Sequence, residues 1–233
     1  MIRLSILILL SFSSVCHAQM TSEQLLDRAI AYHDPQGLWS TFAGDFKVVM
    51  KTPNRPDRHS MITIDLVNKY FNLSVDRDGK TSFREITNQQ CRYQDTDGNI
   101  MTTVVTDSLC ERTVMYRNYY TYLYGLPMKL RDPGTILTSD HPTTVNFQGK
   151  EYLTISVSYS PEVGTDVWQF YFDPETYRME IYQFLKHGEP NTGEYILLTG
   201  EANIQGIRMP RDRAWYYNKD DKYLGTDYLM GGG

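Results

Sequence analysis

The stretch Met61-Ile62-Thr63-Ile64-Asp65-Leu66-Val67 alternates between two sets of side chains. Ile62, Ile64 and Leu66 occupy every second position, and the residues between them form the other face. A period of two is typical of a β-strand that turns one face toward a core. Residues 46–50 repeat the pattern in the preceding part of the chain. Both segments are therefore predicted to be strands.

Turn signals recur between such segments at strand spacing. They are Asp78-Gly79, Asp97-Gly98, Gln148-Gly149 and Asp173-Pro174. Pairs of this kind favour the tight turns that join antiparallel strands. Further strands are predicted over residues 152–159, 167–172, 178–186, 195–205 and 213–217. Some of them, residues 167–172 above all, are apolar on both faces.

Two segments break the alternation and are predicted to be helices. The first begins at Thr21, which has capping-box spacing to Gln24. The second begins with the same spacing at Ser108 and Glu111 and ends at Gly125. Its apolar residues cover most of its circumference, as in a helix that is buried on more than one side. The expected fold is mainly β (α+β), with a curved, unclosed antiparallel β-barrel or sheet wrapped around two or three helices.

Composition narrows the classes of protein. The chain has 233 residues, of which 41% are hydrophobic and 22% are charged. A chain of this length and hydrophobic fraction can form one sizeable core. The hydrophobic fraction is also too high for a disordered chain. A net charge of −5 leaves no basic surplus to neutralise phosphates, so nucleic acid is not an expected partner. No linker or repeat divides the sequence, and residues 19–233 are expected to form a single domain.

Residues 1–18 are predicted to be a signal peptide. A positive start precedes an apolar run, and Cys16 and Ala18 fit the small residues required before cleavage at Gln19. The run is shorter than the about 20 residues of a membrane span. A lipoprotein anchor at Cys16 is the alternative, which Val15 disfavours because a small residue normally precedes the lipidated cysteine. The mature protein is therefore expected in the periplasm.

Two cysteines, Cys91 and Cys110, remain after the signal. An even number of cysteines in an exported protein favours a disulfide bond. The alternative is a pair of buried free thiols.

Signatures of catalysis and of metal binding are weak. The sequence holds none of the nucleophile-elbow, zinc-protease, dinucleotide or C-x-x-C motifs. Residues 74–85 share several positions with a calcium loop, but position 1 is Ser74 and strands flank it, so a hairpin at Asp78-Gly79 is favoured. Neither a metal ion nor another cofactor is predicted.

His33 and Asp34 are the one pair that suggests acid–base chemistry. Asp45 or Glu85 from the sheet would complete such a site. The competing interpretation is structural, because a histidine at a helix end interacts well with the last carbonyl groups and Asp-Pro initiates turns.

Four segments carry a resemblance to a known superfamily. They are Tyr32-His33-Asp34-Pro35-Gln36-Gly37-Leu38-Trp39, Gly125-Leu126-Pro127-Met128-Lys129-Leu130, Phe172-Asp173-Pro174-Glu175-Thr176 and Gly206-Ile207-Arg208-Met209-Pro210. With the order of elements, they resemble the LolA/LolB-like periplasmic lipoprotein carriers, and most closely an uncharacterised bacterial family among them. The resemblance implies an unclosed barrel whose helices cover an apolar cavity for acyl chains. The lipid-contacting residues of the carriers find no match here.

We therefore expect a noncatalytic, monomeric envelope protein that binds a lipid, a lipoprotein acyl chain or another apolar small molecule. The tyrosine-rich second helix and the strand over residues 167–172 are expected to form the ligand pocket. The pocket is expected to be bordered by Tyr116, Tyr120, Leu123, Trp168 and Phe170. Two alternatives remain open, namely a periplasmic enzyme at His33-Asp34 and a structural envelope protein with a packed interior and no ligand.

Overall fold

The computed structural model describes residues 19–231. Within them are two α-helices, α1 (Ser22–His33) and α2 (Glu111–Gly125). Short 3-10 turns are η1 (Trp39–Thr41), η2 (Ser108–Cys110), η3 (Met128–Arg131) and η4 (Lys186–Gly188). In chain order the strands are β1 (Ala43–Lys51), β2 (Arg58–Asp65), β3 (Tyr70–Arg77), β4 (Lys80–Thr87), β5 (Gln90–Gln94), β6 (Ile100–Val104), β7 (Thr135–Leu137), β8 (Thr143–Phe147), β9 (Lys150–Tyr159), β10 (Val167–Phe172), β11 (Met179–Leu185), β12 (Glu194–Ile204), β13 (Ile207–Tyr217) and β14 (Tyr223–Met230).

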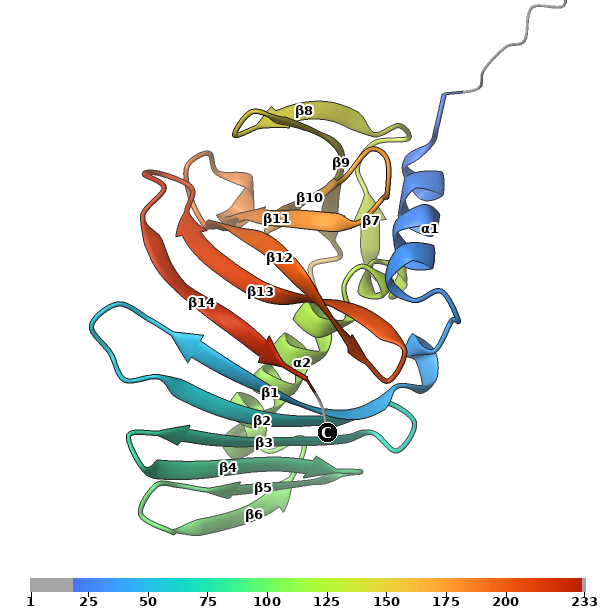
Figure 1. Cartoon of the computed structure of the whole chain (residues 1–233). Helices are drawn as coiled ribbons and strands as arrows, with labels where there is room; N and C mark the ends of the chain where they lie inside the picture. Colours follow the sequence, from blue (N-terminus) through green and yellow to red (C-terminus); the bar gives the residue numbers. More distant parts are fainter. Residues whose placement is uncertain (1–18, 232–233) are drawn as a thin grey trace, which may run out of the picture.

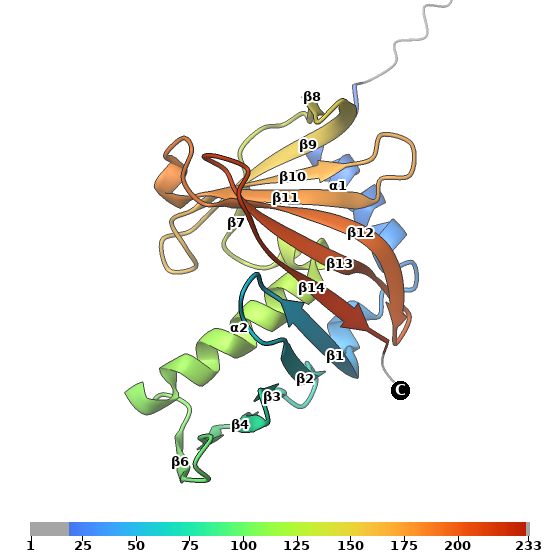
Figure 2. The ribbon, with the colours of Figure 1, turned by 60° about the vertical axis from the view of Figure 1, so that its left-hand side comes forward.

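The strands of the described chain form one antiparallel sheet. Its order is β6-β5-β4-β3-β2-β1-β14-β13-β12-β11-β10-β9-β7, and β8 pairs with β9 outside this path. The path begins at β6 and ends at β7, so the sheet is open. Figures 1 and 2 show that it curves and that α2 lies along its concave side. The predicted fold class, a curved and unclosed antiparallel sheet with helices, is confirmed.

The predicted turns occupy hairpins. Asp78 and Gly79 join β3 to β4 with φ angles of 56° and 74°. Two successive positive φ angles belong to a two-residue hairpin turn that matches the twist of its strands. The calcium-like stretch is therefore this hairpin, as the alternation indicated. Gln148 and Gly149 join β8 to β9 in the same way.

Helix α1 begins with the predicted capping box. The Thr21 hydroxyl accepts a hydrogen bond from the Gln24 N–H, and the Gln24 side chain accepts one from the Thr21 N–H. Leu25, Leu26 and Ala29 are fully buried in the main core. One apolar face of α1 thus packs against the sheet, as the helical period predicts.

Helix α2 begins differently from the prediction. The expected capping box of Ser108 and Glu111 is wrong, because residues 108–110 form η2 and α2 starts only at Glu111. The side chain of Asp107 instead accepts a hydrogen bond of 2.8 Å from the N–H of Leu109. A 3-10 turn shifts the helix start, so capping residues three apart no longer match.

The expectation that α2 is buried on more than one side holds for only part of its surface. Tyr120, Leu123 and Tyr124 are buried in the core. Met115, by contrast, keeps 52% of its surface exposed and Tyr119 keeps 37%. One apolar strip of α2 therefore lacks a covering layer.

The strand β10 is apolar on both faces because a second small core covers its outer side. Trp168, Phe170 and Phe172 alternate toward the main core. On the opposite face Tyr171 packs with Tyr152, Ile181 and the β8 residues Val145 and Phe147. A strand that is covered on both faces has a continuous run of apolar residues in its sequence.

The C-terminal strands extend beyond the predicted ones. The strand predicted over 213–217 begins earlier, at Ile207. Pro210 lies inside this strand, β13, and pairs with Glu201 on β12. Strand β14 was not predicted, and it joins β13 to β1 in the middle of the sheet. Among residues 19–231, no helix is both long enough and apolar enough to span a membrane. The proposed signal peptide lies outside the described residues.

Candidate functional site

A cavity of about 1070 Å³ lies against the exposed strip of α2. We call it the apolar cavity. Its apolar and aromatic walls come from the end of β2, from α2, and from the segment β9–β10, and they include Leu66, Met115, Tyr119, Tyr122, Tyr159 and Trp168. Its volume is at the upper end of the roughly 300–1,000 Å³ that is common for small-molecule sites.

Three aromatic residues build one wall of the apolar cavity. The ring of Tyr122 lies edge-on to Trp168, with ring centroids 5.5 Å apart. The hydroxyl groups of Tyr122 and Tyr159 form a hydrogen bond with each other. Burial raises the pKa of Tyr159 to about 12, so this phenol is uncharged near neutral pH. The wall is therefore fixed in position and neutral.

Polar residues also line the apolar cavity. Lys129 and Asp132 form an ion pair with each other, which compensates one positive and one negative charge. The Asp65 carboxylate accepts a hydrogen bond of 2.9 Å from the Asn68 N–H, and this interaction lowers its pKa. The cavity thus combines apolar walls with polar groups, some of which already have partners, an arrangement suited to an apolar ligand with a small polar end.

The predicted pocket residues lie in three places. Trp168 lines the apolar cavity. Tyr116 and Tyr120 line a second cavity of about 360 Å³ on another face of α2. Leu123 and Phe170 line neither of these cavities and are buried in the main core. The five residues are therefore not brought together around one pocket.

Met115 and Tyr119 are two of the lining residues that the prediction of site residues left out. They lie four residues apart on α2, on the same side of the helix. A change of one position rotates a side chain about 100° around the helix axis. Tyr119 and Tyr120 consequently face different cavities. The helical period predicts which side chains share one side of α2. Only the packing of the sheet against α2 shows which of these side chains stay exposed.

His33 has a structural role in this fold. Its Nδ1 atom lies 2.7 Å from the carbonyl oxygen of Arg208, and its Nε2 atom lies 3.1 Å from the N–H of Met179. A carbonyl only accepts and an N–H only donates, so the ring must be the neutral tautomer with hydrogen on Nδ1. Burial lowers the pKa of His33 to about 4, consistent with this form.

The neighbouring carboxylate is also engaged. Asp34 accepts hydrogen bonds from the N–H groups of Leu38, at 2.7 Å, and Trp39, at 2.8 Å. It therefore holds the start of η1. Asp45 accepts from Thr63, and Glu85 accepts from Tyr70. These contacts favour the structural interpretation of His33-Asp34 over the acid–base one.

In the described part of the chain, no three His, Cys, Asp or Glu side chains are grouped to hold a metal ion. Cys91 and Cys110 form a disulfide bond, with Cα atoms 6.0 Å apart. The predicted pairing is confirmed.

Solved structures of low sequence identity share the fold. A LolA superfamily protein, NE2245 from Nitrosomonas europaea, is 9% identical, with a TM-score of 0.51 over 91% of this chain and 92% of that one. A DUF1329 family protein from Desulfovibrio piger is 8% identical, with a TM-score of 0.53 over 89% and 90% of the two chains. The predicted resemblance to the LolA/LolB-like fold is confirmed.

Two comparisons of sequence complete this result. Residues 3–231 match the family model DUF6503, which is described as a family of unknown function. The search of curated proteins gives no match.

Proposed function

We propose that this chain, which belongs to the DUF6503 family, is a noncatalytic envelope protein that binds an apolar ligand in the apolar cavity. The ligand class is a lipid, the acyl chain of a lipoprotein or a similar apolar molecule. One observation carries the proposal: Met115 and Tyr119 keep 52% and 37% of their surface exposed on the wall of a cavity of about 1070 Å³.

The energetics support an apolar occupant. Each Å² of apolar surface removed from water contributes roughly 25 cal/mol. A ligand chain that covers Met115, Tyr119 and the adjoining face of Trp168 removes protein and ligand surface from water together. Large apolar side chains gathered in a concavity are typical of binding sites, whereas scattered ones are normal on any surface.

The compartment belongs to the same proposal. Residues 1–18 have the composition of a signal peptide, with cleavage between Ala18 and Gln19. The disulfide between Cys91 and Cys110 suits an oxidising compartment. The fold shared with a LolA superfamily protein supports a carrier type of function. We therefore propose that the mature protein is a monomer in the periplasm.

A fluorescent fatty acid tests the proposal on the mature full chain. Wild-type protein should bind the probe saturably, and Met115→Glu should weaken binding by about tenfold or more, because a charge in an apolar site loses its hydration. Met61→Glu is the matched control. Met61 is 47% exposed on β2, and its neighbours Ser60 and Ile62 turn to the opposite, buried face.

Each outcome decides the proposal, provided that thermal unfolding shows all three proteins folded. Loss of binding in Met115→Glu alone supports it. Equal loss in Met61→Glu places the probe elsewhere and overturns it. Folded wild-type protein that binds no fatty acid, phospholipid or lipopeptide probe also overturns it, and leaves a structural role in the envelope.

A further inference from the structure

The second cavity, on the face of α2 that carries Tyr116 and Tyr120, has an unusual charge. We call it the arginine cavity. Five of its lining side chains are cationic, namely Arg58, Arg77, Lys80, Arg84 and Arg112. Among the described residues that line it, none carries a carboxylate. This concentration of positive charge occurs in a chain whose net charge is −5.

Strand pairing places three of these cations side by side. Arg58 on β2 pairs directly with Arg77 on β3, and Arg77 pairs with Lys80 on β4. Arg84 lies four residues after Lys80, so it points to the same face of β4. Like charges directly opposite each other on neighbouring strands destabilise a sheet. A bound anion would remove this repulsion.

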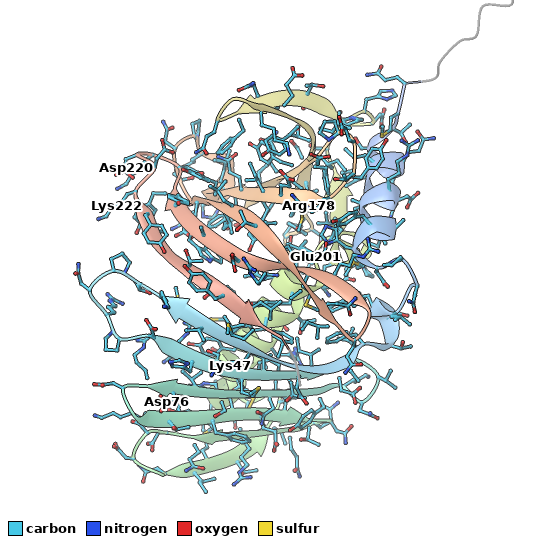
Figure 3. All side chains as sticks on the ribbon, in the orientation of Figure 1. Lys47, Asp76, Arg178, Glu201, Asp220 and Lys222 are labelled. Carbon is cyan, nitrogen blue, oxygen red and sulfur yellow. A yellow bond between two sulfur atoms is a disulfide. The ribbon has the colours of Figure 1, made fainter. Side chains whose placement is uncertain are left out.

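Nearby carboxylates neutralise only part of the group, because the ion pairs of the described residues include Arg58 and none of the other four cations. Asp76, the residue before Arg77, turns to the other face of β3, where its carboxylate accepts a hydrogen bond of 3.2 Å from Thr81. Figure 3 labels Asp76 on this part of the sheet. Arg58 forms an ion pair with Asp227, with 3.9 Å between the charged groups, but this distance is too long for a hydrogen bond and the buried Nε of Arg58 has no hydrogen-bond partner.

Aromatic rings hold Arg84 in place without neutralising it. Its guanidinium carbon lies 4.1 Å from the ring centroid of Tyr93 and 5.5 Å from that of Tyr116. One of its N–H groups donates to the hydroxyl of Thr113 at 3.2 Å. Burial, together with the positive charge of Arg112, lowers the pKa of Arg84. A positioned guanidinium that keeps further N–H groups available suits bidentate binding of an oxyanion.

The hydroxyl groups of the lining residues suit the same ligand. Ser82, Tyr93, Tyr116 and Tyr120 line the cavity together with the cations. Hydroxyl groups donate hydrogen bonds to anionic oxygens. The rings of the three tyrosines form walls for an organic substituent of the ligand. About 360 Å³ is room for a phosphate group and a small attached group.

We propose that the arginine cavity binds a phosphate-bearing ligand through Arg58, Arg77, Lys80, Arg84 and Arg112. The site is separate from the apolar cavity, and the inference does not depend on the proposed function. Several guanidinium groups favour a dianionic phosphate monoester over a carboxylate, because its two negative charges and three terminal oxygens can pair with more than one guanidinium group. The phosphate belongs either to a small soluble ester or to the head group of a lipid.

Isothermal titration calorimetry on the mature full chain separates these sources. The probes are inorganic phosphate, glycerol 3-phosphate, dihexanoyl phosphatidic acid and, as an uncharged reference, glycerol. Binding of glycerol 3-phosphate as tight as that of the short-chain lipid identifies a soluble ester. Binding of the lipid alone identifies a head group. Either result supports the proposal when glycerol does not bind and when added salt weakens binding.

Variants locate the binding. Arg84→Gln and Arg112→Gln should each weaken it by about tenfold or more. Lys47→Gln removes the same charge from β1, where Figure 3 labels Lys47, and should leave binding unchanged. Phe46 and Val48, on either side of Lys47, are buried, so Lys47 turns to the opposite face of the sheet.

The proposal is overturned if folded wild-type protein binds none of the phosphate probes. It is also overturned if Lys47→Gln weakens binding as much as Arg84→Gln, since the effect would then be one of net charge. Met115→Glu should keep phosphate binding, which distinguishes a failure of this site from a failure of the apolar cavity.

Discussion

Cys91 on β5 and Cys110 at the end of η2 are joined by a disulfide bond, which ties the sheet near its β6 edge to the start of α2. The bond closes a loop between residues 19 positions apart. In the chain-entropy model a loop of this length contributes about 3 kcal/mol of stability. Reduction, or Cys91→Ala with Cys110→Ala, should lower the free energy of unfolding by about 2–4 kcal/mol in urea titrations.

Two free thiols in unfolded, unreduced protein would contradict the bond. A double variant as stable as the wild type would contradict its energetic role. Because Arg112 follows Cys110 by two residues, loss of the bond should also weaken phosphate binding, whereas Lys47→Gln should not.

Stability should fall as the pH decreases from about 6.5 to about 4, because of His33. Burial lowers the pKa of His33 from 6.5 to about 4. Between these values the unfolded chain binds a proton that the folded chain does not, so the free energy of unfolding decreases by about 1.4 kcal/mol per pH unit. The full contribution of this group is about 3 kcal/mol.

The variant His33→Gln separates this effect from other titrations. It should be less stable than the wild type at pH 7.5, since the contacts to Arg208 and Met179 change. Its stability should nevertheless depend less on pH between 6.5 and 4. Urea unfolding at several pH values measures both slopes, and parallel slopes would contradict the buried, neutral ring.

Leu123→Ala should reduce stability without reducing affinity for the fatty acid probe. Leu123 is 4% exposed and belongs to the main core. Truncation of a buried leucine costs about 2–5 kcal/mol. Because Leu123 does not line the apolar cavity, folded protein should bind the probe as the wild type does. A folded Leu123→Ala variant with no affinity for the fatty acid probe would support the pocket predicted from sequence, which Leu123 borders.

Gly125→Ala should destabilise the end of α2. A Cβ atom at Gly125 would overlap the ring of Trp39, which is buried in the main core. Overpacking of this kind costs typically about 1–3 kcal/mol. Gly37→Ala is an informative comparison, since nothing lies near its Cβ position and only its φ of 68° opposes the change. Equal thermal stability of Gly125→Ala and the wild type would contradict this packing.

The sheet could be predicted from sequence because its signals are local. Alternation within residues 61–67 and the positive φ angles of pairs such as Asp78-Gly79 are properties of a few neighbouring residues. The pairing of β14 between β13 and β1 could not be predicted in this way. The pairing of β14 with β1 joins segments that lie far apart in the sequence, and no local pattern encodes it.

The sites depend on tertiary structure in the same manner. Arg58, Arg77 and Arg112 come from β2, β3 and α2, so the sequence gives no sign that they line one cavity. The tyrosine-rich helix did indicate an interior surface. Met115, Tyr119 and Leu123 follow one another at intervals of four residues on α2, but the sheet covers Leu123 and leaves Met115 and Tyr119 exposed.

Native mass spectrometry tests ligand binding in the apolar cavity most directly. For this measurement the full-length chain is expressed in a bacterium, and the protein is purified from the periplasmic fraction without detergent. The account predicts a population heavier than the polypeptide by the mass of one lipid-sized ligand, present in wild type and Met61→Glu and lost in Met115→Glu. A wild-type spectrum that shows the mass of the polypeptide alone would contradict it.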